Sequence, residues 1–180
     1  MEKLNYKKEL VEPFALNTIA CSYDKSYKYY LWNKSEDNSD FVSPNGETSL
    51  EVSVVIPLNI QRAVVFESSK KANISYVKDA EIGENGLLKK FYGGSIEELK
   101  QLIIERVYEK QDKAKNRNKK YTTYELCLCI DDGGLFEYER EMFFLLNHKT
   151  IFSKIFLITS SRFFVLENET IVSYKRKIMD

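Results

Sequence analysis

The sequence predicts an α/β fold, in which helices flank a mixed β-sheet, and a single domain over residues 1–180. Two segments support this prediction most directly. Residues 125–132 (ELCLCIDD) are apolar on both faces, which is typical of a central strand covered on both sides. Residues 95–114 carry apolar side chains at helical spacing, starting behind a serine cap. Strand and helix segments follow one another along the chain, and this order favours a sheet with helices on its faces.

The composition is that of an ordinary soluble globular protein, with 43% hydrophobic and 30% charged residues. The chain has 27 basic and 27 acidic residues, so its formal net charge is zero. No global field therefore attracts nucleic acid or a membrane, and any basic surface must be local. Twelve tyrosines and eleven phenylalanines favour strands and an aromatic core.

The cysteines and the N-terminus indicate a cytoplasmic protein. The chain has three cysteines and one histidine, and the C-x-C pair Cys127 and Cys129 lacks a second pair that could complete a zinc site. We therefore expect free thiols in a reducing compartment. Residues 1–12 contain no apolar core of a signal peptide, and no segment approaches the roughly 18 apolar residues of a membrane span. No membrane association is expected.

Residues 4–23 have apolar side chains at approximately helical spacing, which predicts a first helix. Pro13 interrupts this segment. It either kinks the helix or occupies the first turn of a helix that begins near Glu12.

Three strands are expected next. Residues 26–33 are rich in aromatics and predict a strand, and the polar residues 34–39 predict a hairpin connection. Residues 40–43 and 49–57 predict two further strands, joined by the Pro44–Glu47 turn. Alternation in the last of these strands puts Leu50, Val52, Val54 and Ile56 on one face and Glu51, Ser53 and Val55 on the other.

The middle of the chain has weaker signals. Residues 58–72 have spacing that permits a helix and β-branched residues that permit a strand, and the helix is favoured. Residues 73–94 contain four glycines and little periodicity, so they are expected to be mostly loop with a short strand at 74–78.

The helix that starts at Ser95 is the clearest element. Ser95 and Glu98 form an S-x-x-E capping box ahead of an apolar stripe. The 3.6-residue spacing of this stripe continues onto Lys110 and Ala114, so Lys110 is expected to face inward. The stripe comprises Ile96, Leu99, Ile103 and Val107.

After the central strand, Gly133 and Gly134 lead into residues 135–149, which predict an amphipathic helix. Extra C-terminal strands are expected after it, the last two as a hairpin-like pair. They span 154–160, 162–168 and 170–176.

The predicted order of elements resembles the αβββαβ core of the restriction-endonuclease-like, or PD-(D/E)XK, superfamily. The segment SDF, seven residues, then LEVS is similar to the superfamily's signature, in which an Asp at the start of one core strand precedes Glu-x-Lys on the next. The helix LIIERVYEKQDKAKNRNKKY followed by YELCLCIDD is similar to the helix-then-strand half of that core. The resemblance covers roughly residues 5–132.

The resemblance implies a Mg²⁺-dependent nuclease that acts on DNA. Asp40 and Glu51 would be the metal ligands, together with the backbone carbonyl of Val52, and Glu9 or Glu12 on the first helix would add a carboxylate. Mg²⁺ takes hard oxygen ligands, and two carboxylates on adjacent strands converge if they project from one face of the sheet.

The sequence departs from the signature at the lysine position, which is Ser53 here. A neutral hydroxyl does not replace an ammonium. In some active members of the superfamily the lysine has moved to the following helix. Lys110 is then the natural candidate for the catalytic lysine, and Lys113 is the next.

Each of these residues also has a structural interpretation. Asp40 can be a turn residue, Lys110 can extend its ammonium to solvent from the end of the stripe, and Glu9 and Glu12 can be solvated helix charges. The basic run over residues 110–120 can follow a phosphate backbone or form a solvated helix end.

Two further hypotheses therefore stand beside the nuclease. One is a catalytically inactive nuclease-fold module, for example in a phage- or defence-related protein, that binds a protein partner or DNA without metal chemistry. The other is an unrelated α/β interaction protein.

Overall fold

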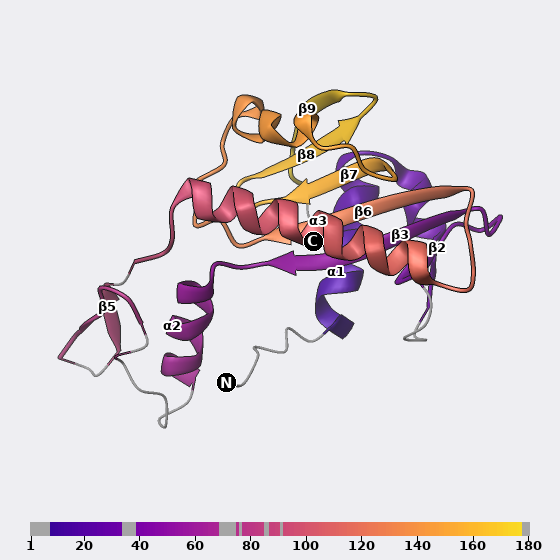
Figure 1. Cartoon of the computed structure of the whole chain (residues 1–180). Coiled ribbons are helices and arrows are strands. Elements are labelled where there is room, and N and C mark those ends of the chain that lie inside the picture. The colour runs from indigo at the N-terminus through magenta and orange to yellow at the C-terminus, as the bar shows by residue number, and fades with distance from the viewer. Residues whose placement is uncertain are drawn as a thin grey trace.

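The structure is a computed structural model that describes residues 8–33, 39–68, 75, 77–84, 87–90 and 92–177. Its main feature is a seven-stranded mixed sheet with helices on both faces (Figure 1), as the sequence predicts. The strand order is β1-β2-β3-β6-β7-β8-β9. The pairs β3–β6 and β6–β7 are parallel, and the other pairs are antiparallel. The strands are β1 (Leu31–Trp32), β2 (Phe41–Val42), β3 (Thr48–Val55), β6 (Thr123–Ile130), β7 (Phe152–Ile158), β8 (Arg162–Glu167) and β9 (Thr170–Lys175).

Helix α1 (Lys8–Ser22) covers one face of the sheet with Ala15 and Ile19, both fully buried. Pro13 lies inside the helix, so the alternative of a start near Glu12 is wrong. Pro13 is the sixth residue of the helix, beyond the first turn, so it removes the backbone hydrogen bond that would reach back to Glu9 and crowds the Glu9 carbonyl.

The strand predicted at residues 26–33 is mostly wrong. Residues Lys25–Tyr29 form a 3₁₀ helix, η1, and only Leu31 and Trp32 are extended. Asp24 caps η1, because its side chain accepts a hydrogen bond of 2.8 Å from the backbone N–H of Ser26. Tyr27 therefore contributes to the core from a helical turn, whereas Tyr29 is exposed. The predicted connection 34–39 lies outside the described residues except for Ser39.

Strands β2 and β3 are confirmed, and alternate residues of β3 face opposite sides of the sheet. Leu50 and Val52 pack in the cluster under α1, whereas Val55 packs in the cluster under α3. The turn between the strands closes through Gly46, whose N–H donates to the carbonyl of Ser43 at 2.8 Å. Gly46 has a φ of 75°, a conformation that glycine adopts without strain.

The segment between β3 and α3 forms helix α2 (Leu58–Ser68) and a small antiparallel pair, β4 (Glu81–Ile82) with β5 (Leu88–Lys90). The preference for a helix after β3 is confirmed. The strand expected at 74–78 is not present in the described residues of that range; it lies later in the chain. Figure 1 shows α2 and β5 beyond the end of β3, away from the seven-stranded sheet.

Helix α3 (Ile96–Asn116) covers the opposite face from α1. Its capping box is confirmed: the Ser95 hydroxyl accepts from the N–H of Glu98 at 3.1 Å, and the Glu98 carboxylate accepts from the N–H of Ser95 at 3.2 Å. The inward stripe is confirmed as well, and it comprises Leu99, Ile103, Val107, Lys110, Gln111 and Ala114.

The predicted helix at 135–149 is in the right place but has another form. It is a 3₁₀ helix, η3 (Glu139–Asn147), preceded by a turn. Asp132 stabilises this turn, because its carboxylate accepts from the N–H of Phe136 at 2.9 Å and from the N–H of Ser160 at 3.0 Å. The pair Asp131–Asp132 thus serves a strand-to-helix turn.

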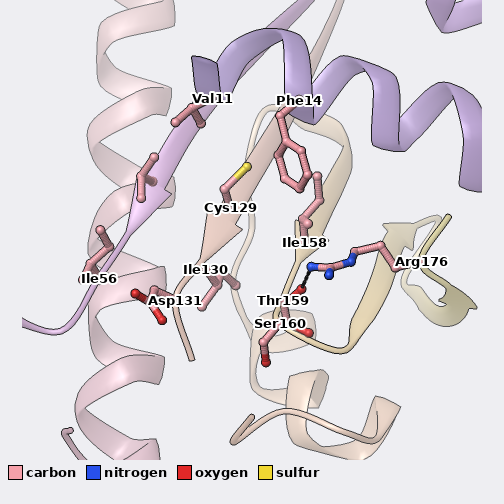
Figure 2. Close-up of a pocket in the computed structure, with 11 residues that line it drawn as sticks. Val11, Phe14, Ile56, Cys129, Ile130, Asp131, Ile158, Thr159, Ser160 and Arg176 are labelled. Carbon is pink, nitrogen blue, oxygen red and sulfur yellow. Dashed lines mark hydrogen bonds between the residues drawn. The ribbon is translucent and has the colours of Figure 1, made fainter. Parts of the chain in front are cut away.

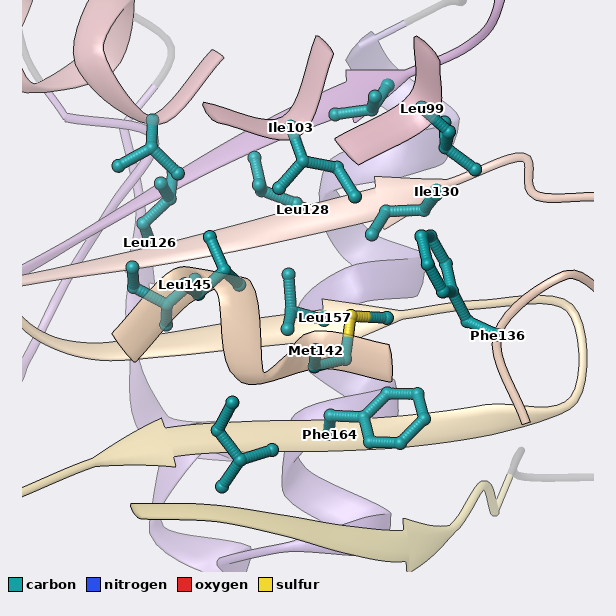
Figure 3. Packing of buried hydrophobic residues seen from close by; sticks show 14 of the residues in the cluster. Leu99, Ile103, Leu126, Leu128, Ile130, Phe136, Met142, Leu145, Leu157 and Phe164 are labelled. Atoms are coloured by element: carbon teal, nitrogen blue, oxygen red, sulfur yellow. The ribbon is translucent and has the colours of Figure 1, made fainter. Parts of the chain in front are cut away.

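Strand β6 lies at the centre of the sheet, with apolar side chains on both faces as predicted. Figure 3 shows Leu126, Leu128 and Ile130 of β6 packed beneath Leu99 and Ile103 of α3. Leu145 and Met142 of η3 complete this cluster over β7 and β8. On the other face Cys127 joins the α1 cluster.

Candidate functional site

The site is formed where β2 begins and β3 continues past the last residue that pairs with β2. The last paired residues are Phe41 and Leu50. Asp40 precedes Phe41 and Glu51 follows Leu50, so the two carboxylates stand opposite each other on the same side of the sheet. The carboxylate of Asp40 accepts a hydrogen bond of 2.7 Å from the N–H of Val52. The Asp40 side chain therefore bonds to the edge of β3 just past the last β2 pair.

Lys110 of α3 joins these two carboxylates. Its Nζ lies 3.4 Å from Glu51 Oε2 and 3.8 Å from Asp40 Oδ2. The placement follows from the helical stripe, which turns Lys110 toward β3, and from β3 itself, which turns Glu51 toward α3. All three side chains are buried, with exposed fractions of 5% for Asp40, 1% for Glu51 and 7% for Lys110.

Arg117 is the member of the site that the sequence interpretation missed. Its Nη1 donates to Glu51 Oε1 and its Nη2 donates to Glu51 Oε2, the latter at 3.1 Å. The guanidinium thus holds both carboxylate oxygens, and the residue is 8% exposed. A signal existed, because the stripe that runs from Lys110 to Ala114 next reaches Arg117. The sequence prediction places Arg117 only in the basic run over residues 110–120.

Asp40, Glu51, Lys110 and Arg117 form what we call the ion cluster. It holds two negative and two positive side chains, so it is electrically balanced. Balance is what allows four charged groups to be buried together, because an unpaired charge in the interior is strongly unfavourable. Lys110 does not extend its ammonium to solvent, because the ammonium lies beside Glu51 and Asp40. Asp40 is more than a turn residue, because its carboxylate is bonded to the N–H of Val52 in β3.

A pocket of about 220 Å³ lies beside the ion cluster, between α1, α3 and the part of β3 that extends past β2. We call it the edge pocket. Lys110 of the ion cluster also lines this pocket, and so does Val52, whose N–H donates to Asp40. The lining residues are Val11, Glu12, Val52, Ser53, Val54, Arg106, Glu109, Lys110 and Lys113.

The remaining predicted site residues divide between the edge pocket and the surface. Glu12 is 5% exposed and accepts a hydrogen bond of 2.6 Å from the Trp32 indole N–H. Ser53 and Lys113 line the pocket, Ser53 half-buried and Lys113 exposed. Glu9 is exposed on the first turn of α1 and does not line the pocket. The structure therefore favours Glu12 over Glu9 as the helix carboxylate nearest the site.

The site offers the kind of donor atoms that Mg²⁺ binds, but its carboxylates are already paired with cationic side chains. Two carboxylates and the backbone carbonyl of Val52 are hard oxygen donors, which this ion prefers. Arg117, however, already occupies both oxygens of Glu51. Within the described part of the chain, no group of three or more His, Cys, Asp or Glu side chains is arranged to hold a metal ion. Arg117 therefore competes with a cation for Glu51.

A second pocket, of about 260 Å³, lies at the carboxyl ends of β3, β6 and β7 (Figure 2). Its walls are mainly apolar, with Phe14 of α1 opposite Ile158 of β7. Arg176 at its rim donates to the carbonyl of Thr159 at 2.8 Å, and Asp131 lies across from it. Burial, followed by the charge of neighbouring Asp132, raises the pKa of the Asp131 carboxyl.

Another buried carboxylate, Glu125, lies on the α1 face of β6. It accepts a hydrogen bond of 2.9 Å from the hydroxyl of Tyr27, and the ammonium of Lys154 lies 3.8 Å away. Burial raises the pKa of Glu125, although the Tyr27 hydrogen bond and the Lys154 charge act in the opposite direction. Burial also raises the pKa of Tyr27, and the negative charge of Glu125 adds to this shift.

The cysteines are free thiols, as expected. None of the described helices is long and apolar enough to cross a membrane. His148, the single histidine, lies with its Nδ1 3.1 Å from the hydroxyl of Tyr108, away from the ion cluster.

Comparisons of the chain with protein-family models, with curated proteins and with solved structures gave no match. The geometry of the ion cluster and the edge pocket is therefore the basis for assigning a function.

Proposed function

We propose that this protein is a divergent restriction-endonuclease-like nuclease, which hydrolyses DNA phosphodiesters with the help of Mg²⁺ at the ion cluster. The observation that carries the proposal is the position of Lys110. Its ammonium comes from the helix after the Glu51 strand and lies within 4 Å of both carboxylates that the sequence signature selects. It also lines the adjoining edge pocket.

The order of elements supports the same proposal. Leaving out α2 and the β4–β5 pair as an insertion, the chain runs through α1, β1, β2, β3, α3 and β6. This is the αβββαβ order that the resemblance implies. The parallel pairing of β3 with β6 through α3 brings the inward face of that helix over Glu51.

The chain's own groups have distinct roles in this proposal. Asp40, Glu51 and the Val52 carbonyl would hold Mg²⁺, which when bound polarises a phosphate and lowers the pKa of water. The ammonium of Lys110 stabilises the negative charge that develops on the phosphate during hydrolysis. Ser53 has no charge to contribute, so Lys110 takes the place of the signature lysine.

The edge pocket provides a surface for the substrate. Arg106 and Lys113 line it from α3, and a phosphodiester backbone is attracted by such cations. Arg106 is paired with Glu109 at 2.8 Å, so Lys113 is the more available of the two.

The test is a cleavage assay with labelled single-stranded and double-stranded DNA in Mg²⁺ or Mn²⁺. We expect cleavage that requires the divalent ion and falls on the order of 100-fold in Glu51→Gln and in Lys110→Met. Lys89→Met is the matched control, because it removes an exposed ammonium from β5, outside the ion cluster and the edge pocket, and its cleavage rate should stay within a few-fold of that of the unaltered protein. Cleavage that persists in Glu51→Gln contradicts the proposal.

A second candidate function has its own observation in favour. Arg117 and Lys110 balance both carboxylates without a metal, as in an inactive nuclease-fold module that binds a partner. In that case the unaltered protein does not cleave DNA in Mg²⁺ or in Mn²⁺. The same assay therefore separates the two candidates.

A further inference from the structure

Arg117 holds the carboxylate that the proposed metal site needs. Its two terminal nitrogens donate to the two oxygens of Glu51 and Lys110 donates to Oε2, so three donors take up most of the acceptor sites of this carboxylate. A divalent cation at Glu51 would place its charge beside the buried cations Lys110 and Arg117, which is unfavourable. Arg117 and a cation therefore compete for Glu51.

The position of Arg117 in the chain makes its departure feasible. It is the residue after the last turn of α3, and its extended ψ of 148° takes the backbone out of the helix. The direction of its side chain therefore depends on the backbone of the connection between α3 and β6 as well as on the helix. Lys110, by contrast, lies within α3 and stays beside Glu51 when Arg117 moves.

Arg117 is also incompletely satisfied where it lies. Its Nε is buried and has no hydrogen-bond partner among the residues described. A buried donor without a partner is unfavourable, so the present pairing is not the best environment that this guanidinium can have. A phosphate offers an alternative, because guanidinium binds phosphate with the same bidentate geometry that it uses for carboxylate.

The chain next to Arg117 is rich in lysine, and the exposed Asp112 is an acidic residue on the same helix end. Lys113, Lys115, Lys119 and Lys120 are exposed on the end of α3 and on the connection that follows. Two of them already have local contacts: Lys119 lies over the Tyr121 ring at 5.0 Å, and Lys120 donates to the carbonyl of Lys115. A nucleic-acid backbone drawn to these lysines would bring phosphates near Arg117.

We propose that Arg117 is a substrate-operated gate on the metal site. In the absence of nucleic acid it holds Glu51 and keeps the cation out; when nucleic acid binds, it transfers to a backbone phosphate and frees Glu51 for the cation. This inference rests on the proposed function. It adds a thermodynamic consequence: nucleic acid and divalent cation each raise the affinity of the protein for the other, by the same factor.

The test measures Mn²⁺ binding by calorimetry, with and without a phosphorothioate oligonucleotide that resists cleavage. In the unaltered protein we expect the oligonucleotide to raise Mn²⁺ affinity at least tenfold. In Arg117→Met we expect Mn²⁺ to bind at least tenfold more tightly than to the unaltered protein without any oligonucleotide. The oligonucleotide should then raise the Mn²⁺ affinity of Arg117→Met only slightly.

Two further variants sharpen the result. Lys89→Met removes one exposed positive charge from β5, outside the lysine-rich surface and without touching Glu51, so its Mn²⁺ affinity should match that of the unaltered protein. Arg117→Gln keeps hydrogen-bond donors for Glu51 but no charge, and it provides the comparison if Arg117→Met fails to fold by circular dichroism. Its Mn²⁺ affinity should lie between those of the unaltered protein and Arg117→Met.

The outcomes distinguish the gate from the site. Mn²⁺ binding that is equally tight in the unaltered protein and in the Arg117 variants, and independent of the oligonucleotide, overturns the gate and leaves the metal site standing. Absence of Mn²⁺ binding in every variant, with the oligonucleotide present, overturns the proposed function and the gate together.

Discussion

The buried residue Glu125 contributes a pH dependence to the stability of the protein. Its carboxyl is 3% exposed, and its Oε2 is buried without a hydrogen-bond partner in the described part of the chain. Burial disfavours the charged form, so the folded protein binds the proton more tightly than the unfolded chain does. The protonated form of Glu125 therefore stabilises the fold at low pH.

We expect this contribution to be present below pH 4.5, the ordinary pKa of a glutamate, and to be lost as the pH rises through the higher pKa of folded Glu125. Glu125→Gln removes the titration, so the variant should gain stability relative to the unaltered protein as the pH increases. Urea unfolding at several values between pH 4 and pH 7.5 measures this difference. Glu169→Gln, at an exposed position, is the control. If the stability of Glu125→Gln followed the same pH profile as that of the unaltered protein, the expectation would be contradicted.

Residue-scale chemistry also separates the two groups of buried charges. Both oxygens of Glu51 accept from Arg117, and Lys110 lies 3.4 Å from one of them. Glu125 accepts from the Tyr27 hydroxyl and has Lys154 at 3.8 Å, but its Oε2 has no hydrogen-bond partner among the described residues. The same residue type is thus fully paired at Glu51 and incompletely paired at Glu125.

Helix α3 is the element on which the site depends. It positions Lys110 over Glu51 and buries Leu99, Ile103 and Val107 on the same stripe. The register of this stripe is defined at its start by the capping box of Ser95 and Glu98.

Loss of the cap should therefore weaken the whole protein. We expect Ser95→Ala to lower the free energy of unfolding by about 1 kcal/mol, because the N–H of Glu98 loses its acceptor. Glu98→Gln is the matched control, since an amide oxygen still accepts from the N–H of Ser95, and it should cost less. Chemical denaturation monitored by circular dichroism measures both, and equal losses for the two variants would argue against the reciprocal box.

At the element scale, sequence periodicity was most reliable where one local rule decided the structure. The cap and stripe of α3 and the two apolar faces of β6 were predicted correctly, because propensity and burial agree there. It failed at residues 26–33, where Asp24 caps a 3₁₀ turn that competes with the strand propensity of the tyrosines. It also missed the short β4–β5 pair, which has little hydrophobic periodicity to detect.

At the scale of the whole molecule, one central sheet joins two hydrophobic clusters. Strand β6 contributes Leu126 and Leu128 to the cluster under α3 and Cys127 to the cluster under α1. Because one strand supports both clusters, loss of packing on one face removes support from the other. The sheet should therefore unfold as one cooperative unit.

Ile103→Ala tests this cooperativity. Ile103 is fully buried under α3, and its truncation should cost about 3 kcal/mol. Fluorescence of Trp32, the single tryptophan, reports on the first strand of the sheet, while circular dichroism reports on the whole chain. Both probes should shift by the same amount. A shift seen by only one probe would mean that the two faces of the sheet unfold separately. Leu10→Ala is the control, because Leu10 is exposed on α1, and it should change the free energy of unfolding by less than about 0.5 kcal/mol.

The sequence by itself determined the α/β class, the course of α3, β3, β6 and the C-terminal strands, and the three candidates Asp40, Glu51 and Lys110. The elements follow from periodicity and capping, which act over a few residues, whereas the three candidates follow from the resemblance to the restriction-endonuclease-like superfamily. Only the tertiary structure decided that Arg117 takes both oxygens of Glu51, and that Glu12 faces the edge pocket while Glu9 faces solvent. Those choices depend on which side chains meet when β3, α1 and α3 pack together. Local sequence patterns do not show which residues far apart in the chain will meet. In the folded structure each buried charge requires a partner, and this requirement decides the pairing.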